Sequence, residues 1–339
     1  MKLIAYNNEQ AFEELKPEWN ALLERSAYNS IFSTWEWQSN WWAAYEPGEL
    51  WIITARTDDD RLVGLATWFI ETNDAGERIV RGVGCVDVTD YVDIVIDAGC
   101  TEPVYNFLAE FLAENREKYD RINLCNLPEP SPTHQRFPGF LEKFGFETAV
   151  ELQEVCPVIE LPDEWNDYLS SLSKKHRHEL RRKMRRAHGQ GSVDWYIVDE
   201  THDIDEQLNL FLKLMADSDP EKAEFLEDKN NLDFFHKVMP VMFECGWLSL
   251  NFLTVDGNPA AAYLNFDYHG RILVYNSGLS QDYGAISPGI VLLGHNIRYA
   301  IENGYQHFDF LRGNEEYKYH MGGKDTPVYM LQATINQPA

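Results

Sequence analysis

The feature that most constrains the fold is an order of elements that occurs twice along the chain. In each half, a strand, an Asp-containing turn, two or three further strands, a helix and a short apolar strand follow one another. The first copy has strands at 50–56, 61–71, 78–86 and 91–96, a turn at 57–60, a helix at 103–118 and a short apolar strand at 121–127. The second copy has strands at 247–255, 260–268 and 271–279, a turn at 256–259, a helix at 288–303 and a short apolar strand at 307–311. Two such units predict an α/β protein with a mixed sheet, because the strands outnumber the helices.

The length of 339 residues fits two domains. We expect an N-terminal domain over 1–160, a basic linking helix over 161–190 and a C-terminal domain over 191–339. Helical spacing predicts one helix at 9–26 and another that carries Trp37, Trp41 and Trp42. These tryptophans either pack in a core or form the wall of a ligand groove. Ser33 or Thr34 can cap their helix.

Charge and cysteine content exclude several classes of protein. The formal net charge is -26, which disfavours nucleic acid and anionic membranes as partners. The 5 cysteines form no CxxC pair, and their odd number argues against a secreted disulfide framework. The first 20 residues lack the apolar core of a signal peptide, and no window is apolar enough for a transmembrane span. A cytoplasmic location is therefore expected.

One segment is strongly basic. Residues 174–186 hold eight Lys or Arg and one Glu, a local charge of +7, on a helix predicted from Asp163 to about 188 and stopped by Gly189. Three interpretations stay open for it. The cations can cover a solvated linking helix, they can contact the phosphates of coenzyme A, or they can bind tRNA, anionic lipid or glycan.

The start of the helix in the second copy has the features of an anion site. Ser287 can cap this helix, Pro288 suits its first position, and Gly289 allows close approach to the backbone. A strand, a glycine-containing loop and an open helix start would point free N–H groups and the helix dipole at a phosphate. Capping alone explains the same residues. The dinucleotide fingerprint GxGxxG and the phosphate loop GxxxxGK are both absent, as is HExxH.

Together these segments resemble a known family. The runs FSTWEWQSNWWAAY, LVGLATWF, LSKKHRHELRRKMRR and SPGIVLLGHNIRYAIENGYQHFDFLRGNEEYKYHMGG are similar to GNAT-fold acyltransferases of the FemAB-like and BioF-like acetyltransferase kind, over about residues 30 to 325. The resemblance implies two tandem GNAT-like domains. It also implies transfer to an amine of an acyl group from coenzyme A, or of an amino acid from charged tRNA. The family's [QR]xxGx[GA] pattern is kept only at Gln281 and Gly284.

The block from Phe308 to Gly323 carries the groups that such a reaction needs. A carboxylate can take the proton of the amine, and a tyrosine can protonate the leaving thiolate. The catalytic residues expected here are Asp309, Glu316 and Tyr317, with Glu315 as an alternative base. The residues expected to bind acyl-CoA are Asn276, Ser277, Ser287, Pro288, Gly289, Arg312 and Lys318. No metal site is expected, because His295, His307 and His320 lack partners at ligand spacing.

The sequence therefore predicts an acyl-CoA-dependent N-acyltransferase, with acetyl-CoA or another acyl-CoA as co-substrate. The acceptor expected is a primary amine of a sugar, polysaccharide precursor or small metabolite. Two alternatives remain. One is an aminoacyl-tRNA-dependent transferase of the FemAB type, and the other is a GNAT-like binding module without activity.

Overall fold

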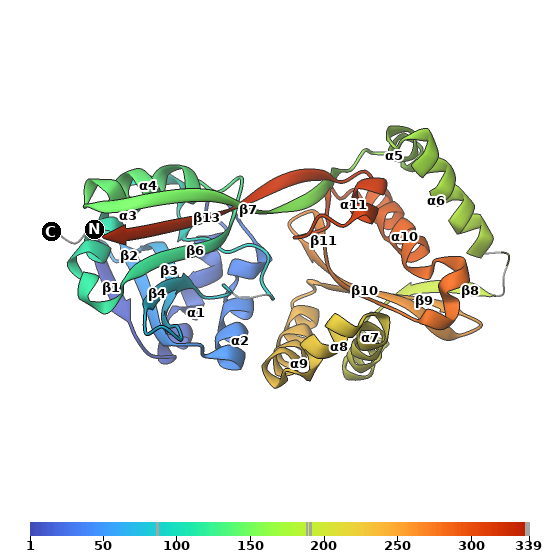
Figure 1. Cartoon of the computed structure of the whole chain (residues 1–339), viewed down its shortest axis with the longest axis horizontal. Helices are drawn as coiled ribbons and strands as arrows, with labels where there is room; N and C mark the ends of the chain where they lie inside the picture. The colour runs from blue at the N-terminus through green and yellow to red at the C-terminus, as the bar shows by residue number, and fades with distance from the viewer. Residues whose placement is uncertain (86–87, 188, 190–191, 336–339) are drawn as a thin grey trace. The chain divides into compact units, whose positions relative to one another are not determined.

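The computed structural model describes residues 1–85, 88–187, 189 and 192–335. The chain forms two compact units, the first from 1–154 with the residues after 325, and the second from 155–325. The ends of the predicted strand 78–86 and of the predicted helix 163–188 lie outside the described residues. Figure 1 shows the elements of both units along the chain.

The sheet of the first unit is mixed. Its strand order is β1-β2-β3-β4-β6-β13, and β5 pairs with β3. The described neighbours in this order are antiparallel except β4 and β6, which run parallel. The strands are β1 (Lys2–Tyr6), β2 (Glu49–Arg56), β3 (Leu62–Thr72), β4 (Arg78–Gly82), β5 (Val95–Ile96), β6 (Arg121–Pro128) and β13 (Lys324–Ile335).

Helices cover both faces of this sheet (Figure 1). They are α1 (Gln10–Leu23), α2 (Trp35–Tyr45), α3 (Thr101–Glu114) and α4 (Thr133–Lys143). Helices α3 and α4 share one core with alternate residues of β2, whereas α2 packs Trp41 and Trp42 against Phe69 on the other face. Trp37 and Trp41 are fully buried, which confirms core packing for the tryptophan-rich helix. The helix is capped by Thr34, whose Oγ1 accepts from the N–H of Trp37 at 3.2 Å.

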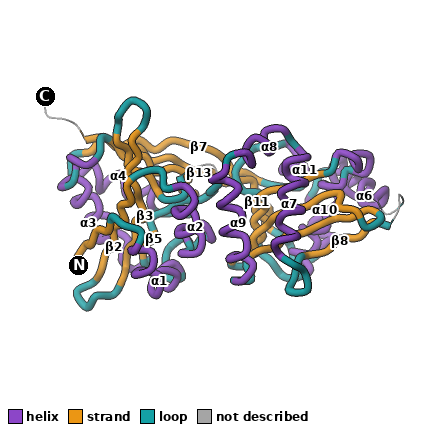
Figure 2. Tube along the Cα trace, turned by 90° about the horizontal axis from the view of Figure 1, so that it is seen from below, coloured by secondary structure: helices purple, strands orange, loops and turns teal. Residues whose placement is uncertain are grey.

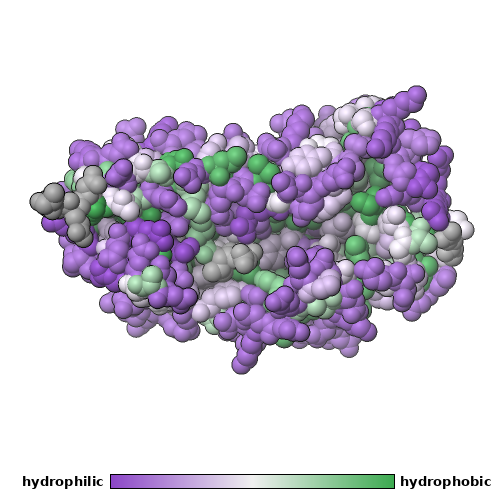
Figure 3. Space-filling model, in the orientation of Figure 1, coloured by the Kyte–Doolittle hydropathy of each residue, from purple (hydrophilic) through white to green (hydrophobic). Residues whose placement is uncertain are grey.

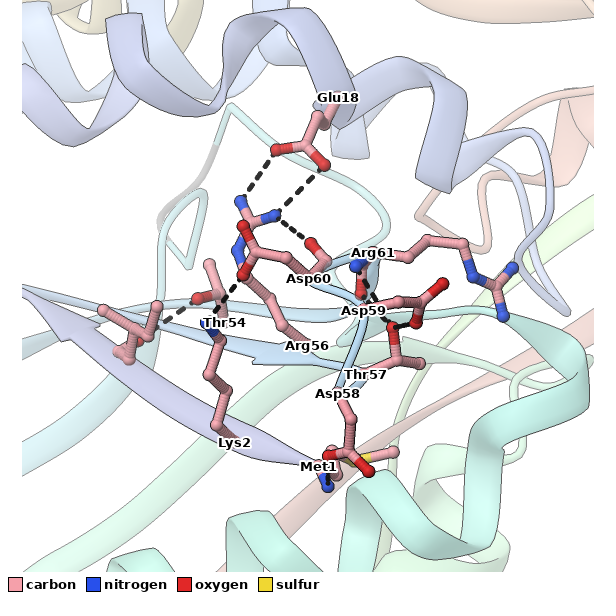
Figure 4. Close-up of polar contacts among 11 residues, drawn as sticks. Met1, Lys2, Glu18, Thr54, Arg56, Thr57, Asp58, Asp59, Asp60 and Arg61 are labelled. Carbon is pink, nitrogen blue, oxygen red and sulfur yellow. Dashed lines mark hydrogen bonds and ion pairs between the residues drawn. The ribbon is translucent and has the colours of Figure 1, made fainter.

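The Asp-rich turn between β2 and β3 is held by ion pairs, which Figure 4 shows in close-up. Arg56 is 8% exposed and binds both carboxylate oxygens of Glu18 on α1, at 2.7 and 3.1 Å. Lys2 pairs with Asp60 at 2.7 Å. The bidentate geometry ties the turn to α1 and fixes the hairpin that the sequence predicts.

The second unit repeats the same plan. Its strand order is β7-β12-β11-β10-β9-β8, with β11 and β12 parallel and the other pairs antiparallel. The strands are β7 (Phe146–Glu160), which begins in the first unit, β8 (Val193–Ile197), β9 (Leu248–Val255), β10 (Asn258–Tyr268), β11 (Arg271–Leu279) and β12 (His307–Asp309). The repeated order of elements predicted from the sequence is therefore present in both sheets.

Helices also cover both faces of the second sheet. They are α5 (Trp165–Ser171), α6 (Lys174–Ala187), α7 (Ile204–Ser218), α8 (Pro220–Glu227), α9 (Lys229–Glu244), α10 (Pro288–Glu302) and α11 (Glu316–His320). Helices α5, α6 and α10 share one core with the sheet, and α7 and α9 lie across the opposite face, which Figure 2 shows from below.

The structure differs from the sequence predictions in several elements. The predicted helix from Asp163 is two helices, because Leu172 is extended and Ser173 starts a new helix by accepting from the N–H of His176 at 3.2 Å. Residues 146–160, for which the sequence analysis gives no element, form one long strand. The sequence analysis did not predict β1, β8, β13 or helices α7, α8 and α9.

The units also divide the chain differently from the predicted ranges 1–160, 161–190 and 191–339. The basic helix α6 is part of the second unit, because Leu180 and Met184 pack on Gly294 of α10. The last strand, β13, begins in the second unit and then pairs with β6 of the first unit. Long-range strand pairing decides this return, and a local pattern does not encode it.

Cys85 and Cys125 form a disulfide within the first unit, with a Cα–Cα distance of 6.0 Å, which the cysteine spacing does not predict. Hydrophilic residues cover most of the face shown in Figure 3, as the charge of -26 leads one to expect. None of the described helices is both long and apolar enough to cross a membrane.

Candidate active site

Two parallel strands of the second unit diverge soon after they begin to pair. Strand β11 pairs with β12 only from Arg271 with His307 to Leu273 with Asp309. On its other edge, β11 stays paired with β10 as far as Leu279. A bulge opposite the step from Leu264 to Asn265 adds local twist to this pair. Beyond Leu273, the edge of β11 on the side of β12 has no parallel strand partner in the described chain.

Helix α10 begins at the end of this strand, after the 3-10 helix Gln281–Ile286. Ser287 occupies the N-cap position with a φ of 53°, and no side chain caps the helix, so the predicted capping by Ser287 is wrong. Pro288 has no N–H, and the N–H of Val291 bonds to the Ser287 carbonyl. The open helix start therefore presents the N–H groups of Gly289 and Ile290 together with the positive end of the helix dipole.

A cavity of about 340 Å³ lies at this helix start. Its size falls in the range of small-molecule sites. Residues of β10, β11, the 3-10 helix, α10, α6 and α11 line it: Lys183, Tyr263, Ser277, Leu279, Ser280, Gln281, Gly284, Ser287, Pro288, Gly289, Ile290 and Tyr317. Five predicted site residues, Ser277, Ser287, Pro288, Gly289 and Tyr317, are thus brought together. Asn276, Asp309, Arg312, Glu316 and Lys318 do not line it.

Two tyrosines stand in the cavity wall. Burial raises the pKa of Tyr317 well above its ordinary value, and the charge of Glu315 adds to this. Burial likewise raises the pKa of Tyr263. Both phenols are therefore protonated at neutral pH. Among the described residues, the hydroxyl of Tyr317 has no hydrogen-bond partner, so it is available to a ligand.

Lys318 is a structural residue of the loop before α11. It is 2% exposed, and its Nζ donates to the carbonyl oxygens of Leu311, Arg312 and Gly313 at 3.3, 2.7 and 3.1 Å. It also pairs with a carboxylate oxygen of Glu315 at 2.9 Å. These partners use all the donors of an ammonium group, which leaves none for a phosphate. The expected contact of Lys318 with acyl-CoA is therefore replaced by a role in holding this loop.

Asp309 also stabilises the loop before α11. It is 1% exposed, and its Oδ1 accepts from the N–H of Leu311 at 2.8 Å. Leu311 has a φ of 56°, which a branched side chain rarely adopts, and this hydrogen bond supports that conformation. Phe308 and Phe310 are buried in the core beside α10. The carboxylate of Asp309 thus fixes the turn where β12 ends.

The remaining predicted residues lie outside the cavity. Glu316 pairs with Nε2 of His320 at 3.1 Å, and its side chain is 85% exposed. Asn276 accepts from the N–H of Ser277 at 2.8 Å. Arg312 lies in the loop that Lys318 holds. No group of three or more metal-ligating side chains occurs within the described part of the chain.

Sequence reasoning missed several residues at this site, among them two lysines and a tyrosine. Lys183 and Tyr263 line the cavity, and Lys222 on α8 bonds to Ser277. The alternation along β10 places Tyr263 on the face of Ala261, and this was the one local signal available. The two lysines have no such signal, because their positions depend on how helices pack on the sheet.

The first unit has the same divergence, but among its described residues other backbone and side-chain groups lie beside it. Strands β4 and β6 pair only at Ile79 with Arg121 and at Val80 with Ile122. The segment after β4 then fills the gap, since Val92 donates to the Asn126 carbonyl at 2.9 Å and Asn126 donates to the Thr89 carbonyl at 2.8 Å. A Cβ added at Gly82 would lie 2.6 Å from Val92 Cγ1. The candidate site therefore belongs to the second unit.

Comparison with known proteins agrees with this geometry. Residues 174–319 match the family described as an acetyltransferase (GNAT) domain. No curated protein matches the chain.

Solved structures extend the likeness to the whole chain. FemX is 14% identical with a TM-score of 0.69, covering 100% of this chain and 98% of its own. L-PGS from Bacillus licheniformis is 12% identical with a TM-score of 0.54, covering 93% and 90%. A tandem GNAT protein from the clavulanic acid biosynthesis pathway is 11% identical with a TM-score of 0.51, covering 100% of both chains. These likenesses confirm the predicted fold of two tandem GNAT-like domains.

Proposed function

We propose that the chain is a GNAT-fold acyltransferase of the FemAB-like kind, with acyl-CoA as its donor and a primary amine as its acceptor; the match of residues 174–319 and the whole-chain likeness to FemX support this. The amine belongs to a sugar, a polysaccharide precursor or a small metabolite. One observation carries the proposal: β11 leaves β12 beside the uncapped start of α10, and residues of β11 and α10 line one cavity. The expected location remains the cytoplasm, where acyl-CoA is available.

In this proposal the donor binds along the free edge of β11. Its pyrophosphate lies at the N–H groups of Gly289 and Ile290, where the helix dipole favours negative charge. Its pantetheine arm follows 274–277, and the backbone before Ser277 can bond to the pantetheine amides as a strand would. Lys183, on the basic helix α6, lines the same cavity and adds a positive charge near the phosphates.

The reacting groups come from the loop and helix after β12. Glu315, instead of Asp309 or Glu316, takes the proton of the attacking amine, directly or through water, because Lys318 fixes its carboxylate and its charge acts on Tyr317. The amine nitrogen bonds to the carbonyl carbon, and the carbon–sulfur bond breaks. Tyr317 gives its proton to the departing thiolate. A module that binds acyl-CoA without releasing thiol would favour the non-catalytic alternative.

A charge placed beside the helix start tests the donor site. A Cβ at Gly284 meets nothing within 4 Å, whereas one at Gly289 would lie 2.7 Å from Leu279 Cδ2. Gly284→Asp is therefore expected to repel the pyrophosphate without disturbing packing. We expect the Kd of CoA, measured by titration calorimetry, to rise at least about tenfold, or about 1.4 kcal/mol.

Gly284→Asn is the matched control, because it has nearly the same size and no charge. It should bind CoA within about twofold of the parent, a difference below about 0.5 kcal/mol. Equal affinities of the Asp and Asn variants, with both folded, would place the pyrophosphate elsewhere.

The positive charge of α6 favours an alternative donor, aminoacyl-tRNA. Lys174, Lys175, Arg181, Arg185 and Arg186 have no ion-pair partner among the described residues, although the chain has 55 acidic side chains. Unpaired cations along one helix would suit a phosphate backbone. The net charge of -26 opposes a large RNA footprint, so acyl-CoA remains the first proposal.

Charge reversal on α6 separates the two donors. Arg182→Glu, Arg185→Glu and Arg186→Glu together should leave acetyl transfer to a small soluble amine within about tenfold of the parent, or about 1.4 kcal/mol. None of the three lines the cavity. Thiol release from acetyl-CoA would be followed with glucosamine as the amine. Salt-sensitive binding of charged tRNA by the parent, lost in the triple variant, would support the alternative donor instead.

A further inference from the structure

A lysine from the opposite face of the sheet reaches the strand that borders the cavity. Lys222 belongs to α8, which Asp219 caps by accepting from the N–H of Glu221 at 2.8 Å. Its Nζ donates to the carbonyl oxygen of Ser277 at 2.6 Å and lies 3.3 Å from Ser277 Oγ. Ser277 lines the cavity and lies on β11 beyond the point of divergence. Lys222 therefore contacts the part of β11 along which the donor would lie.

Side chains occupy both backbone groups of Ser277. Its N–H donates to Asn276 Oδ1, and its carbonyl accepts from Lys222. Strand β12, which would continue the sheet here, ends at Asp309. The two side chains thus take the place of a strand partner. A donor whose amide and thioester carbonyls run along this edge would meet the ammonium group of Lys222.

The charges around Lys222 include one that also acts on a reacting group. Burial lowers the pKa of Lys222, while the negative charges of Asp219 and Glu315 oppose this effect. Glu315 is also the partner of Lys318 and acts on the pKa of Tyr317. The charge of Glu315 therefore acts on both Lys222 and Tyr317, which enter from opposite faces of the sheet.

We propose that Lys222 is a catalytic residue that donates a hydrogen bond to the thioester carbonyl oxygen of the donor, an inference that rests on the proposed function. As the amine nitrogen bonds to the carbonyl carbon, the π electrons of the carbonyl move to its oxygen, and the ammonium group stabilises this charge. The electrons return as the carbon–sulfur bond breaks. Glu315 holds the proton of the amine, and the thiolate takes the proton of Tyr317. Lys222 neither gains nor loses a proton.

Lys222→Met tests this role, with Lys229→Met on the exposed start of α9 as the matched control. Thiol release from acetyl-CoA would be measured with glucosamine as the amine probe. Loss of one such donor lowers kcat by about 10²–10³-fold. The Kd of CoA, which lacks the thioester carbonyl, should stay within about twofold of the parent, below about 0.5 kcal/mol. Lys229→Met should match the parent in both measurements.

The pH profile separates catalysis from structure. The ammonium form of Lys222 is the active one. The kcat of the parent should therefore fall as pH rises through the pKa of Lys222, and the kcat of Lys222→Met should not show this fall. Lys222→Arg keeps the charge and should recover part of the activity. Two results would overturn the inference while the proposed function stands. One is an unchanged kcat in Lys222→Met. The other is a lower kcat that still falls at high pH as in the parent and that is accompanied by a lower melting temperature. A parent that binds neither CoA nor acetyl-CoA would overturn both the inference and the proposed function.

Discussion

Lys318→Met is expected to destabilise the second unit by about 3 kcal/mol, because one buried and two partly buried carbonyl groups lose their donor at once. The methionine side chain would fill the same space, but it has no N–H to donate to the carbonyl oxygens of Leu311, Arg312 and Gly313. Leu311 would also keep its left-handed backbone with only the hydrogen bond to Asp309 to support it.

Thermal and urea unfolding would measure this effect. We expect the melting temperature to fall by roughly 5–10 °C for a unit of this size. Lys324→Met is the control, since Lys324 is exposed at the start of β13 and should change stability by less than about 0.5 kcal/mol. If Lys318→Met melts like the parent but binds CoA weakly, Lys318 contacts the donor after all, as the sequence analysis expected.

Tyr317→Phe is expected to lower kcat by about 10²–10³-fold, within the usual range for removing a general acid. The phenol lines the cavity, and burial keeps it protonated. Phenylalanine retains the ring that packs edge-on against Phe310, so the fold and the Kd of CoA should be unchanged. The effect should therefore appear in kcat alone.

Single-turnover thiol release from acetyl-CoA, beside calorimetry with CoA, measures this effect. Tyr299→Phe is the matched control, because Tyr299 lies on α10 against Trp195 and Tyr305 and does not line the cavity. A donor with a better leaving group, such as an aryl thioester, should restore much of the rate of Tyr317→Phe. Undiminished kcat with acetyl-CoA would remove Tyr317 from the catalytic residues and leave Tyr263 as the other phenol in the wall.

The relation between the two units explains why only one carries the proposed site. Each unit has a parallel strand pair that diverges after two or three residue pairs. In the first unit, Val92 and Thr89 close the gap through Asn126, whereas in the second unit the gap adjoins a cavity. The two units therefore have parallel strand pairs of the same kind, and the described divergence that adjoins a cavity is the one in the second unit.

The sequence alone determined the features that depend on neighbouring residues. Alternation of apolar residues and Asp- or Gly-containing turns gave the hairpins, because strand faces and turn backbones are set by residues a few positions apart. Ser287, Pro288 and Gly289 marked the open start of α10, since a proline at the first turn has no N–H to satisfy. The resemblance to the family added the tandem arrangement.

The tertiary structure alone decided what each charged residue does. Lys318 looked like a phosphate ligand, but three carbonyls of one loop surround its ammonium group. Asp309 looked like a base, but it caps a strained turn. Lys222 and Lys183 had no sequence signal, yet one bonds to Ser277 and the other lines the cavity. The physical reason is that a side chain's role is set by the partners that desolvate and bond it, and long-range packing of strands and helices brings these partners together.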